Sequence, residues 1–209
     1  MPTTFYIVRH GQSEGNVNGD IMGANPPLTQ IGLEQAQALA KLLKPIKIDQ
    51  IFASDLTRAK QTAQVIAKSK NLKVTEYSQI RERFFGSLDG QKDAEVFAKY
   101  QKQVEEFREK SLIDQMNWKI VEDMESLNEV IRRILPFFNE VAKIDKNQTI
   151  LAVTHANVIM SLLGHFGFIN SFRELPYGCI QNTSYIKIEK TKNSIKIIET
   201  FGINKVEAK

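Results

Sequence analysis

Histidine is scarce in this chain, and two of its 3 histidines stand in the same kind of place. His10 follows the apolar run of residues 5–8, and His155 follows a second apolar run at residues 150–153; each run predicts a buried strand. Ligands of open α/β sheets bind at the carboxyl ends of the strands, so two imidazoles placed there can share one cleft. His165 has no such setting, and we interpret it as structural.

Two arginines are predicted to reach the same edge. Arg9 directly precedes His10, and Arg58 falls in the first turn of the helix that should follow the strand at residues 50–53. A cation in the first turn of a helix is unfavourable because the helix dipole is positive there, so an anionic ligand would explain Arg58. Guanidinium groups hold phosphate oxygens by charge-assisted hydrogen bonds, often two at once. Together with the imidazoles, they predict a pocket for a phosphoryl group.

Strands and helices alternate along the predicted chain. Short apolar runs indicate strands at residues 4–8, 50–53, 73–77 and 149–154, and amphipathic patterns indicate helices at 28–43, after 54 or 55, and from 156. Ser54 or Asp55 is expected to cap the second helix. Residues 184–189 and 194–201 alternate apolar and polar side chains, which predicts a hairpin. This order predicts an α/β fold, a three-layer α/β/α sandwich with a mostly parallel central sheet.

Residues 90–145 differ from the rest because they carry no strand pattern. Apolar side chains recur there at helical spacing, in one stripe within residues 97–107 and another within residues 127–141. Pro136 falls inside the second stripe and predicts a kink or break. We expect residues 1–209 to form a single domain in which the helical segment is partly an insertion, or lid, over the active site.

Composition excludes several classes of protein. The 209 residues are 42% hydrophobic and 25% charged, which is typical of a globular domain. The net charge is only +4 and no basic stripe is present, so we expect no nucleic-acid partner. No apolar run approaches the roughly 18 residues of a membrane span, and we expect no membrane partner. Cys179 is the only cysteine and no secretory signal is evident, so a cytoplasmic location is expected.

Other phosphate-handling chemistries lack their motifs. The chain has neither a P-loop nor the glycine-rich turn of a dinucleotide site. Cys179 is not followed by an arginine at a spacing that would cradle a phosphate, and there is no Asp-x-Asp pair for an aspartyl phosphate. Three histidines and one cysteine do not make a convincing zinc site. We therefore expect neither a metal nor a cofactor.

A series of short motifs runs through residues 5–160. They are Arg9-His10-Gly11 continuing to Asn16, Pro27-Leu28-Thr29, Ser54-Asp55-Leu56-Thr57-Arg58-Ala59, Glu82-x-x-Phe85-Gly86, Glu125-Ser126 with Arg133, and Val153-Thr154-His155. In this order and in these strand and helix contexts, they resemble the histidine phosphatase superfamily, the phosphoglycerate mutase-like group. Two positions depart from its pattern: Ala156 stands where a glycine is common, and Met124 where a glycine often precedes Glu125.

The resemblance implies a role for each candidate residue. His10 would be the nucleophile and carry the phosphoryl group, while Arg9 and Arg58 would hold its oxygens. His155 would donate to the same oxygens. Glu82 would protonate the leaving oxygen and then activate water, which requires a pKa raised above the usual value of about 4.3. Further phosphate contacts are expected from Asn16, Gly23 and Ala156.

Three functions stay open at this point. We favour a phosphatase of small phosphate esters over a mutase. The resemblance implies that mutases of this group have longer chains, with a basic cluster that binds a second anion. A non-catalytic phosphate-binding module is disfavoured because every expected catalytic group is present. The expected partner is a small phosphorylated metabolite whose identity is open, and a homodimer is also open. Specificity would depend on the helical segment and on residues 172–182.

Overall fold

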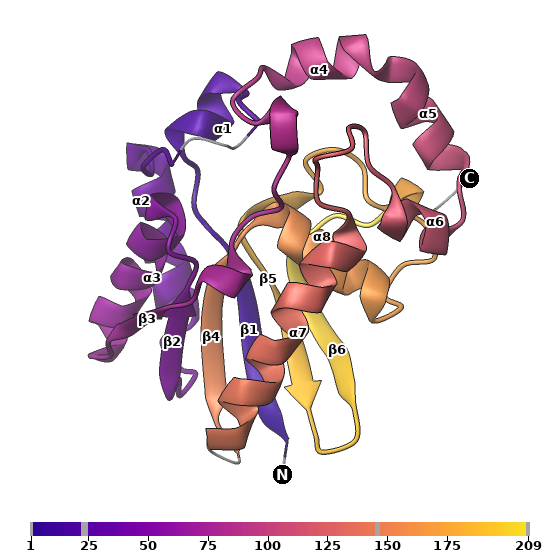
Figure 1. The fold of residues 1–209 in the computed structure, drawn as a ribbon. Coiled ribbons are helices and arrows are strands. Elements are labelled where there is room, and N and C mark those ends of the chain that lie inside the picture. Colours follow the sequence, from indigo (N-terminus) through magenta and orange to yellow (C-terminus); the bar gives the residue numbers. More distant parts are fainter. Residues whose placement is uncertain (1, 22–24, 145–146, 208–209) are drawn as a thin grey trace.

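A single mixed sheet lies at the centre of the computed structural model, which describes residues 2–21, 25–144 and 147–207. Within them the sheet has six strands in the order β3-β2-β4-β1-β5-β6 (Figure 1). The strands are β1 (Thr3–Arg9), β2 (Gln50–Ala53), β3 (Val74–Glu76), β4 (Thr149–Thr154), β5 (Ile180–Lys190) and β6 (Ile195–Ile203). The first four are parallel, and β5 and β6 form an antiparallel hairpin beside β1. The mostly parallel sheet and the hairpin are therefore confirmed.

Helices cover both faces of this sheet. The helices of the described chain are α1 (Glu14–Asn18), α2 (Gln30–Leu42), α3 (Thr57–Lys70), α4 (Asp93–Lys99), α5 (Gln101–Glu109), α6 (Leu112–Asn117), α7 (Leu127–Ile144) and α8 (Ala156–His165). One buried apolar cluster joins the sheet to α2 and α3, and another joins its opposite face to α7 and α8. The predicted three-layer sandwich is confirmed (Figure 1).

Strand β1 shows why the apolar run of residues 5–8 is continuous. Side chains alternate between the faces of a strand. Phe5 and Ile7 accordingly pack toward α7 and α8, whereas Tyr6 and Val8 pack toward α2 and α3. Because β1, β2 and β4 are parallel neighbours, their carboxyl ends meet at one edge of the sheet.

The start of α3 corrects one prediction. Ser54 and Asp55 do not cap this helix; Leu56 occupies the N-cap position and makes no side-chain cap. The two polar residues are engaged elsewhere, because Asp55 forms an ion pair with Arg81 and the Ser54 hydroxyl lies against His155. Long-range contacts thus outweigh the local capping that the sequence suggests.

The described part of the segment predicted at residues 90–145, up to residue 144, is largely helical, but its first stripe is not one helix. The chain bends at Tyr100, which ends α4 and precedes α5. Phe97 is half exposed, whereas the ring of Phe107 packs against Trp118 and Phe172. Helix α7 is not broken at Pro136. Figure 1 shows α4 and α5 arching above the carboxyl edge of the sheet, where the expected lid would lie. In the part of the chain that the structure describes, no helix is long and apolar enough to span a membrane.

Candidate active site

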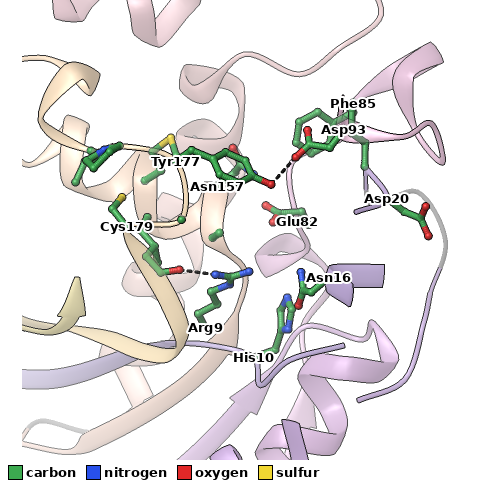
Figure 2. A pocket seen from close by; sticks show the side chains of 17 residues that line it. Arg9, His10, Asn16, Asp20, Glu82, Phe85, Asp93, Asn157, Tyr177 and Cys179 are labelled. Atoms are coloured by element: carbon green, nitrogen blue, oxygen red, sulfur yellow. Dashed lines mark hydrogen bonds between the residues drawn. The ribbon is translucent and has the colours of Figure 1, made fainter. Parts of the chain in front are cut away.

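A cavity of about 410 Å³ opens at the carboxyl edge of the sheet. The end of strand β1 contributes Arg9, and His10 follows it directly; α8 contributes Ala156 and Asn157, and the loop after β3 contributes Glu82 (Figure 2). The remaining lining residues are Asn16, Asp20, Ile21, Phe85, Asp93, Met160, Leu175, Pro176, Tyr177, Gly178, Cys179 and Ile180. Residues from both ends of the chain therefore meet in one cleft.

His10 is held as a neutral imidazole. Its side chain is 1% exposed, and its Nδ1 lies 2.7 Å from the carbonyl oxygen of Gly11. Nδ1 donates to that carbonyl, which leaves the Nε2 lone pair to accept a hydrogen bond from Arg58 Nε at 3.1 Å. Burial, followed by the charges of Arg58 and Arg9, lowers the pKa of His10 well below its usual value. The imidazole is therefore neutral at neutral pH, with its proton on Nδ1 and its lone pair on Nε2.

Two glycines let the His10 loop lie directly on the start of α2. A Cβ on Gly11 would stand 2.4 Å from the carbonyl oxygen of Gly32, and a Cβ on Gly32 would stand 2.0 Å from that of Gln12. The Gly11 N–H donates to Thr62 Oγ1 at 3.0 Å, which ties the same loop to α3. The glycines thus serve packing of backbone on backbone, and this packing fixes where His10 points.

Arg58 is a buried cation with unused hydrogen-bonding capacity. Its side chain is 0% exposed in the first turn of α3, and Nε donates to His10. Among the described residues, neither of its Nη atoms has a hydrogen-bond partner. Burial lowers its pKa to about 10, so it stays charged at neutral pH. A buried charge without partners is costly, and an anion beside His10 would satisfy it.

Arg9 and His155 add further unpaired donors. Arg9 Nη1 donates to the carbonyl of Ile180, while its buried Nε has no partner within the described chain. His155 is 0% exposed, its ring centroid lies 5.1 Å from that of His10, and its Nε2 is 2.9 Å from Ser54 Oγ. Its Nδ1 is buried and has no partner in the described structure. A Ser54 hydroxyl that donates to Nε2 leaves an Nδ1–H for an anion, and burial keeps His155 neutral by lowering its pKa.

Glu82 faces this cluster from the loop after β3. Figure 2 shows its carboxylate between His10 and a further pair, Asp93 and Tyr177. Burial raises the pKa of Glu82 above its ordinary value, although the N–H of Arg83 and the nearby arginine charges oppose the shift. A carboxyl with a raised pKa keeps its proton to a higher pH than a free glutamate does, which suits it to give up a proton and take it back as an acid-base catalyst must.

Helix α7 holds the Glu82 loop in place. Arg133 Nη2 donates to the carbonyl of Glu82 at 3.0 Å and Arg133 Nη1 to that of Gln79 at 2.6 Å. Arg133 Nε also binds Glu125 Oε1 at 2.8 Å, and Glu125 Oε2 accepts from the N–H of Phe84 at 2.9 Å. This arginine and its carboxylate therefore brace the backbone on both sides of Glu82.

The expected phosphate contacts have different outcomes. Asn16 lines the cavity, but its Oδ1 accepts from Ser13 N at 3.1 Å and from Asn182 Nδ2 at 3.4 Å. Only its amide nitrogen is then suited to an anion. Ala156 lines the cavity at the start of α8. Gly23 lies outside the described residues.

Several supporting residues were missed by sequence reasoning. Ser54 and Arg133 stand inside motifs already noted, so their place in those motifs could have marked them, and Thr62 lies one helical turn after Arg58. Asn157 lines the same cavity as Glu82 and follows Ala156 directly. Asn182 Nδ2 donates to the carbonyl of His10 at 3.1 Å across 172 positions of sequence, and nothing in the local pattern indicates that contact.

The donor groups suit an anion and not a metal. The guanidinium of Arg58 lies against Nε2 of His10, and the neutral imidazole of His155 lies beside the His10 ring. Among the described residues, no group of three or more His, Cys, Asp or Glu side chains could hold a metal ion. The positive charge that a phosphoryl group requires is present in the guanidinium groups themselves.

Known proteins resemble this chain over nearly all of its length. The family model described as the histidine phosphatase superfamily (branch 1) matches residues 5–201. Phosphoserine phosphatase 1 of Hydrogenobacter thermophilus is 33% identical over 90% of this chain and 88% of its own. A probable phosphoglycerate mutase of Proteus mirabilis is 33% identical over 76% of this chain and 72% of its own. The crystal structure of phosphoglycerate mutase from Bacillus anthracis superposes with a TM-score of 0.83 at 25% identity, covering 97% of this chain and 93% of that one.

Proposed function

This chain belongs to the histidine phosphatase superfamily, and from that premise we propose that it hydrolyses small phosphate monoesters through a phosphohistidine on His10. The single observation that carries the proposal is the buried, neutral His10 beside unpaired guanidinium and imidazole nitrogens of Arg58 and His155. The relatives are phosphatases and mutases, which supports phosphoryl transfer of this type.

The first step forms a bond between His10 Nε2 and phosphorus. The attack is in line with the ester oxygen, and the bond from phosphorus to that oxygen breaks as Glu82 gives it a proton. Arg58, Arg9 and His155 donate to the phosphoryl oxygens, where negative charge lies in the transition state. The products are an alcohol, a Glu82 carboxylate and phosphorylated His10.

The second step reverses the roles of the same groups. The Glu82 carboxylate takes a proton from water, the water oxygen attacks phosphorus, and the bond from phosphorus to Nε2 breaks. Inorganic phosphate leaves, His10 regains its lone pair and Glu82 is again protonated. Each group thus returns to its starting state, and the arginines supply the positive charge, so we propose that no metal takes part.

Hydrolysis is favoured over a mutase reaction by the lining of the cavity. A mutase of phosphoglycerates must hold a substrate that carries a second anionic group. Arg9 is the only lysine or arginine among the described lining residues, and it lies at the phosphoryl end. We therefore propose a small metabolite with one phosphate as the substrate; a cytoplasmic location and a homodimer stay predictions.

The test is phosphate release from a panel of monoesters in the presence of EDTA, with wild type and His10→Ala side by side. We expect turnover by the wild type and a fall of about 10⁴-fold in kcat for the variant, because the nucleophile is removed. Brief incubation with labelled substrate should leave an acid-labile phosphoryl group on the wild-type protein alone. Turnover that persists in His10→Ala would contradict the assignment, and transfer to 3-phosphoglycerate instead of water would establish the mutase.

A further inference from the structure

The cavity has a second end that the phosphoryl group does not fill. The phosphoryl end is marked by His10 and by the fully buried, unpartnered nitrogens of Arg58 and His155 beside it. Across Glu82 lie Asp20, Asp93, Phe85 and Tyr177, all of which line the same cavity (Figure 2). Since Glu82 protonates the leaving oxygen in the proposed mechanism, the alcohol part of the substrate must occupy this second end.

The charges at this end are acidic. Among the described lining residues beyond Glu82, Asp20 and Asp93 are the charged ones. A carboxylate or second phosphate on the alcohol would lie beside like charges here, and the described lining residues at this end include no lysine or arginine to pair with it.

The two carboxylates are not equivalent. Asp20 Oδ1 accepts from Lys92 Nζ at 2.5 Å, so an ion pair neutralises much of its charge. Asp93 begins α4, and its Oδ2 accepts from the neutral hydroxyl of Tyr177 at 2.5 Å. A carboxylate can accept about four hydrogen bonds, so Asp93 has further accepting capacity toward the cavity.

Aromatic rings complete the surroundings of a cation. Phe85 and Tyr177 line the cavity on the same side as Asp93. The face of an aromatic ring attracts a cation, and at a side chain as exposed as Tyr177 this attraction is modest and adds to that of the Asp93 carboxylate. Met160, Leu175 and neighbouring apolar side chains add a hydrophobic wall. A cavity of about 410 Å³ lies toward the small end of ligand pockets, so the group that fits is compact.

We infer, resting on the proposed phosphatase function, that the alcohol part of the substrate carries an ammonium group in place of a second anion. The substrate class is then the phosphate monoesters of short amino alcohols. Arg58, His155 and Arg9 take the phosphate, and Asp93 takes the ammonium group at the far end.

The first experiment varies only the charge on a two-carbon alcohol. O-Phosphoethanolamine, ethyl phosphate and phosphoglycolate present a positive, a neutral and a negative end, and kcat/KM is measured for each at neutral pH and low salt. We expect phosphoethanolamine to exceed phosphoglycolate by about tenfold or more, with ethyl phosphate between them. O-Phosphoserine carries both charges and should fall below phosphoethanolamine. Added salt should reduce the spread, because it screens the carboxylate.

A matched pair of variants assigns the effect to one side chain. Asp93→Asn removes the charge but keeps an oxygen that can accept from Tyr177, so the contact between α4 and the Tyr177 loop is retained. The ratio of phosphoethanolamine to phosphoglycolate should fall about fivefold in this variant. Glu95→Gln changes an exposed carboxylate on the same helix that does not line the cavity, and it should keep the wild-type ratio.

The outcomes separate this inference from the function on which it rests. Faster turnover of phosphoglycolate or phosphoserine than of phosphoethanolamine, or an unchanged ratio in Asp93→Asn, would overturn the inference and leave the phosphatase intact. No turnover of any ester, p-nitrophenyl phosphate included, would overturn the proposed function. Calorimetry measures the same charge preference as binding affinity, without turnover, and 2-aminoethylphosphonate should bind more tightly than 3-phosphonopropionate. Equal or reversed affinities of these two phosphonates would reject the inference as well.

Discussion

The two ends of the cavity are built from different kinds of structure. The phosphoryl end stands on the central parallel strands, where His10 and His155 are almost fully buried and hydrogen-bonded to the layer beneath. The far end comes from the arch of α4 and from the loop that carries Tyr177, a side chain that is 91% exposed. The phosphoryl end is held in place by the hydrophobic core, and the far end by a few contacts at the surface.

This difference shows which end of the cavity costs folding free energy and at which end substitutions can alter substrate choice. Buried, unpaired nitrogens at the phosphoryl end oppose folding until an anion binds, which is the usual relation between stability and activity at a functional site. The far end has no comparable cost, because the hydrogen-bonding groups of Asp93 and Tyr177 satisfy each other. Substrate choice can therefore be altered there without disturbing the reactive groups.

The largest effect is expected at Arg58. Arg58→Met should lower kcat/KM by about 10³-fold or more, because it removes the cation beside the phosphoryl group. In phosphate-free buffer the free energy of unfolding should stay equal or rise, since the variant replaces a buried, unpaired charge by an apolar side chain. Urea unfolding with and without inorganic phosphate measures both: phosphate should stabilise the wild type and not the variant. A large loss of stability without phosphate would contradict the strain assigned to this end.

The next effect concerns Glu82 and the pH profile. The raised pKa of Glu82 keeps its acid form as pH rises toward neutrality, so activity should fall at higher pH as this group loses its proton. Activity should also fall at low pH, once His10 gains a proton below its lowered pKa. Glu82→Gln should cost about 10²–10³-fold in kcat on alkyl phosphates and remove the high-pH limb.

A leaving group of low pKa provides the control for that prediction. p-Nitrophenolate leaves without full protonation, so Glu82→Gln should lose less on p-nitrophenyl phosphate than on an alkyl phosphate in the first step. An equal loss on both esters, measured in single-turnover experiments, would argue that Glu82 only shapes the loop.

A smaller effect is expected at Arg133, which supports Glu82 from outside the cavity. Arg133→Gln should lower kcat on alkyl phosphates by about tenfold and shift the high-pH limb, with little change in KM, because the brace on the Glu82 carbonyl is lost. Arg132→Gln is the matched control, since that arginine is exposed at the next position of α7. Equal effects of the two variants, or an unshifted pH profile in Arg133→Gln, would show that the brace does not position the acid.

The smallest effect is expected at the hydrogen bond between Tyr177 and Asp93, which joins the Tyr177 loop to α4 at the far end. Tyr177→Phe removes the hydroxyl that donates to Asp93 and so separates α4 from the opposite loop. We expect a change of about two- to threefold in KM and almost none in kcat, because an exposed hydrogen bond contributes little. A loss of kcat as large as that of Arg133→Gln would mean that closing this contact is part of the catalytic cycle, and the two ends would not be separable.

The sequence alone determined the layers and the reactive edge. Continuous apolar runs mark strands buried on both faces, and alternating runs mark the hairpin, so both could be predicted from short stretches. Thr29 caps α2 as its local pattern indicates, with Oγ1 accepting from Gly32 N at 3.0 Å. The two histidines could be placed together because each stands one residue past a central strand. Parallel neighbouring strands bring their carboxyl ends to the same edge of the sheet.

Only the tertiary structure decided the partners of those groups. Ser54 serves His155 instead of capping α3, Asn182 reaches back to the His10 carbonyl, and Arg133 braces Glu82. These contacts join positions 101, 172 and 51 apart in sequence, respectively. A periodicity or a cap depends on residues within one or two turns and is visible in a short window. Which polar groups meet across such separations depends on how complete helices and loops pack on the sheet, and no local pattern contains that information.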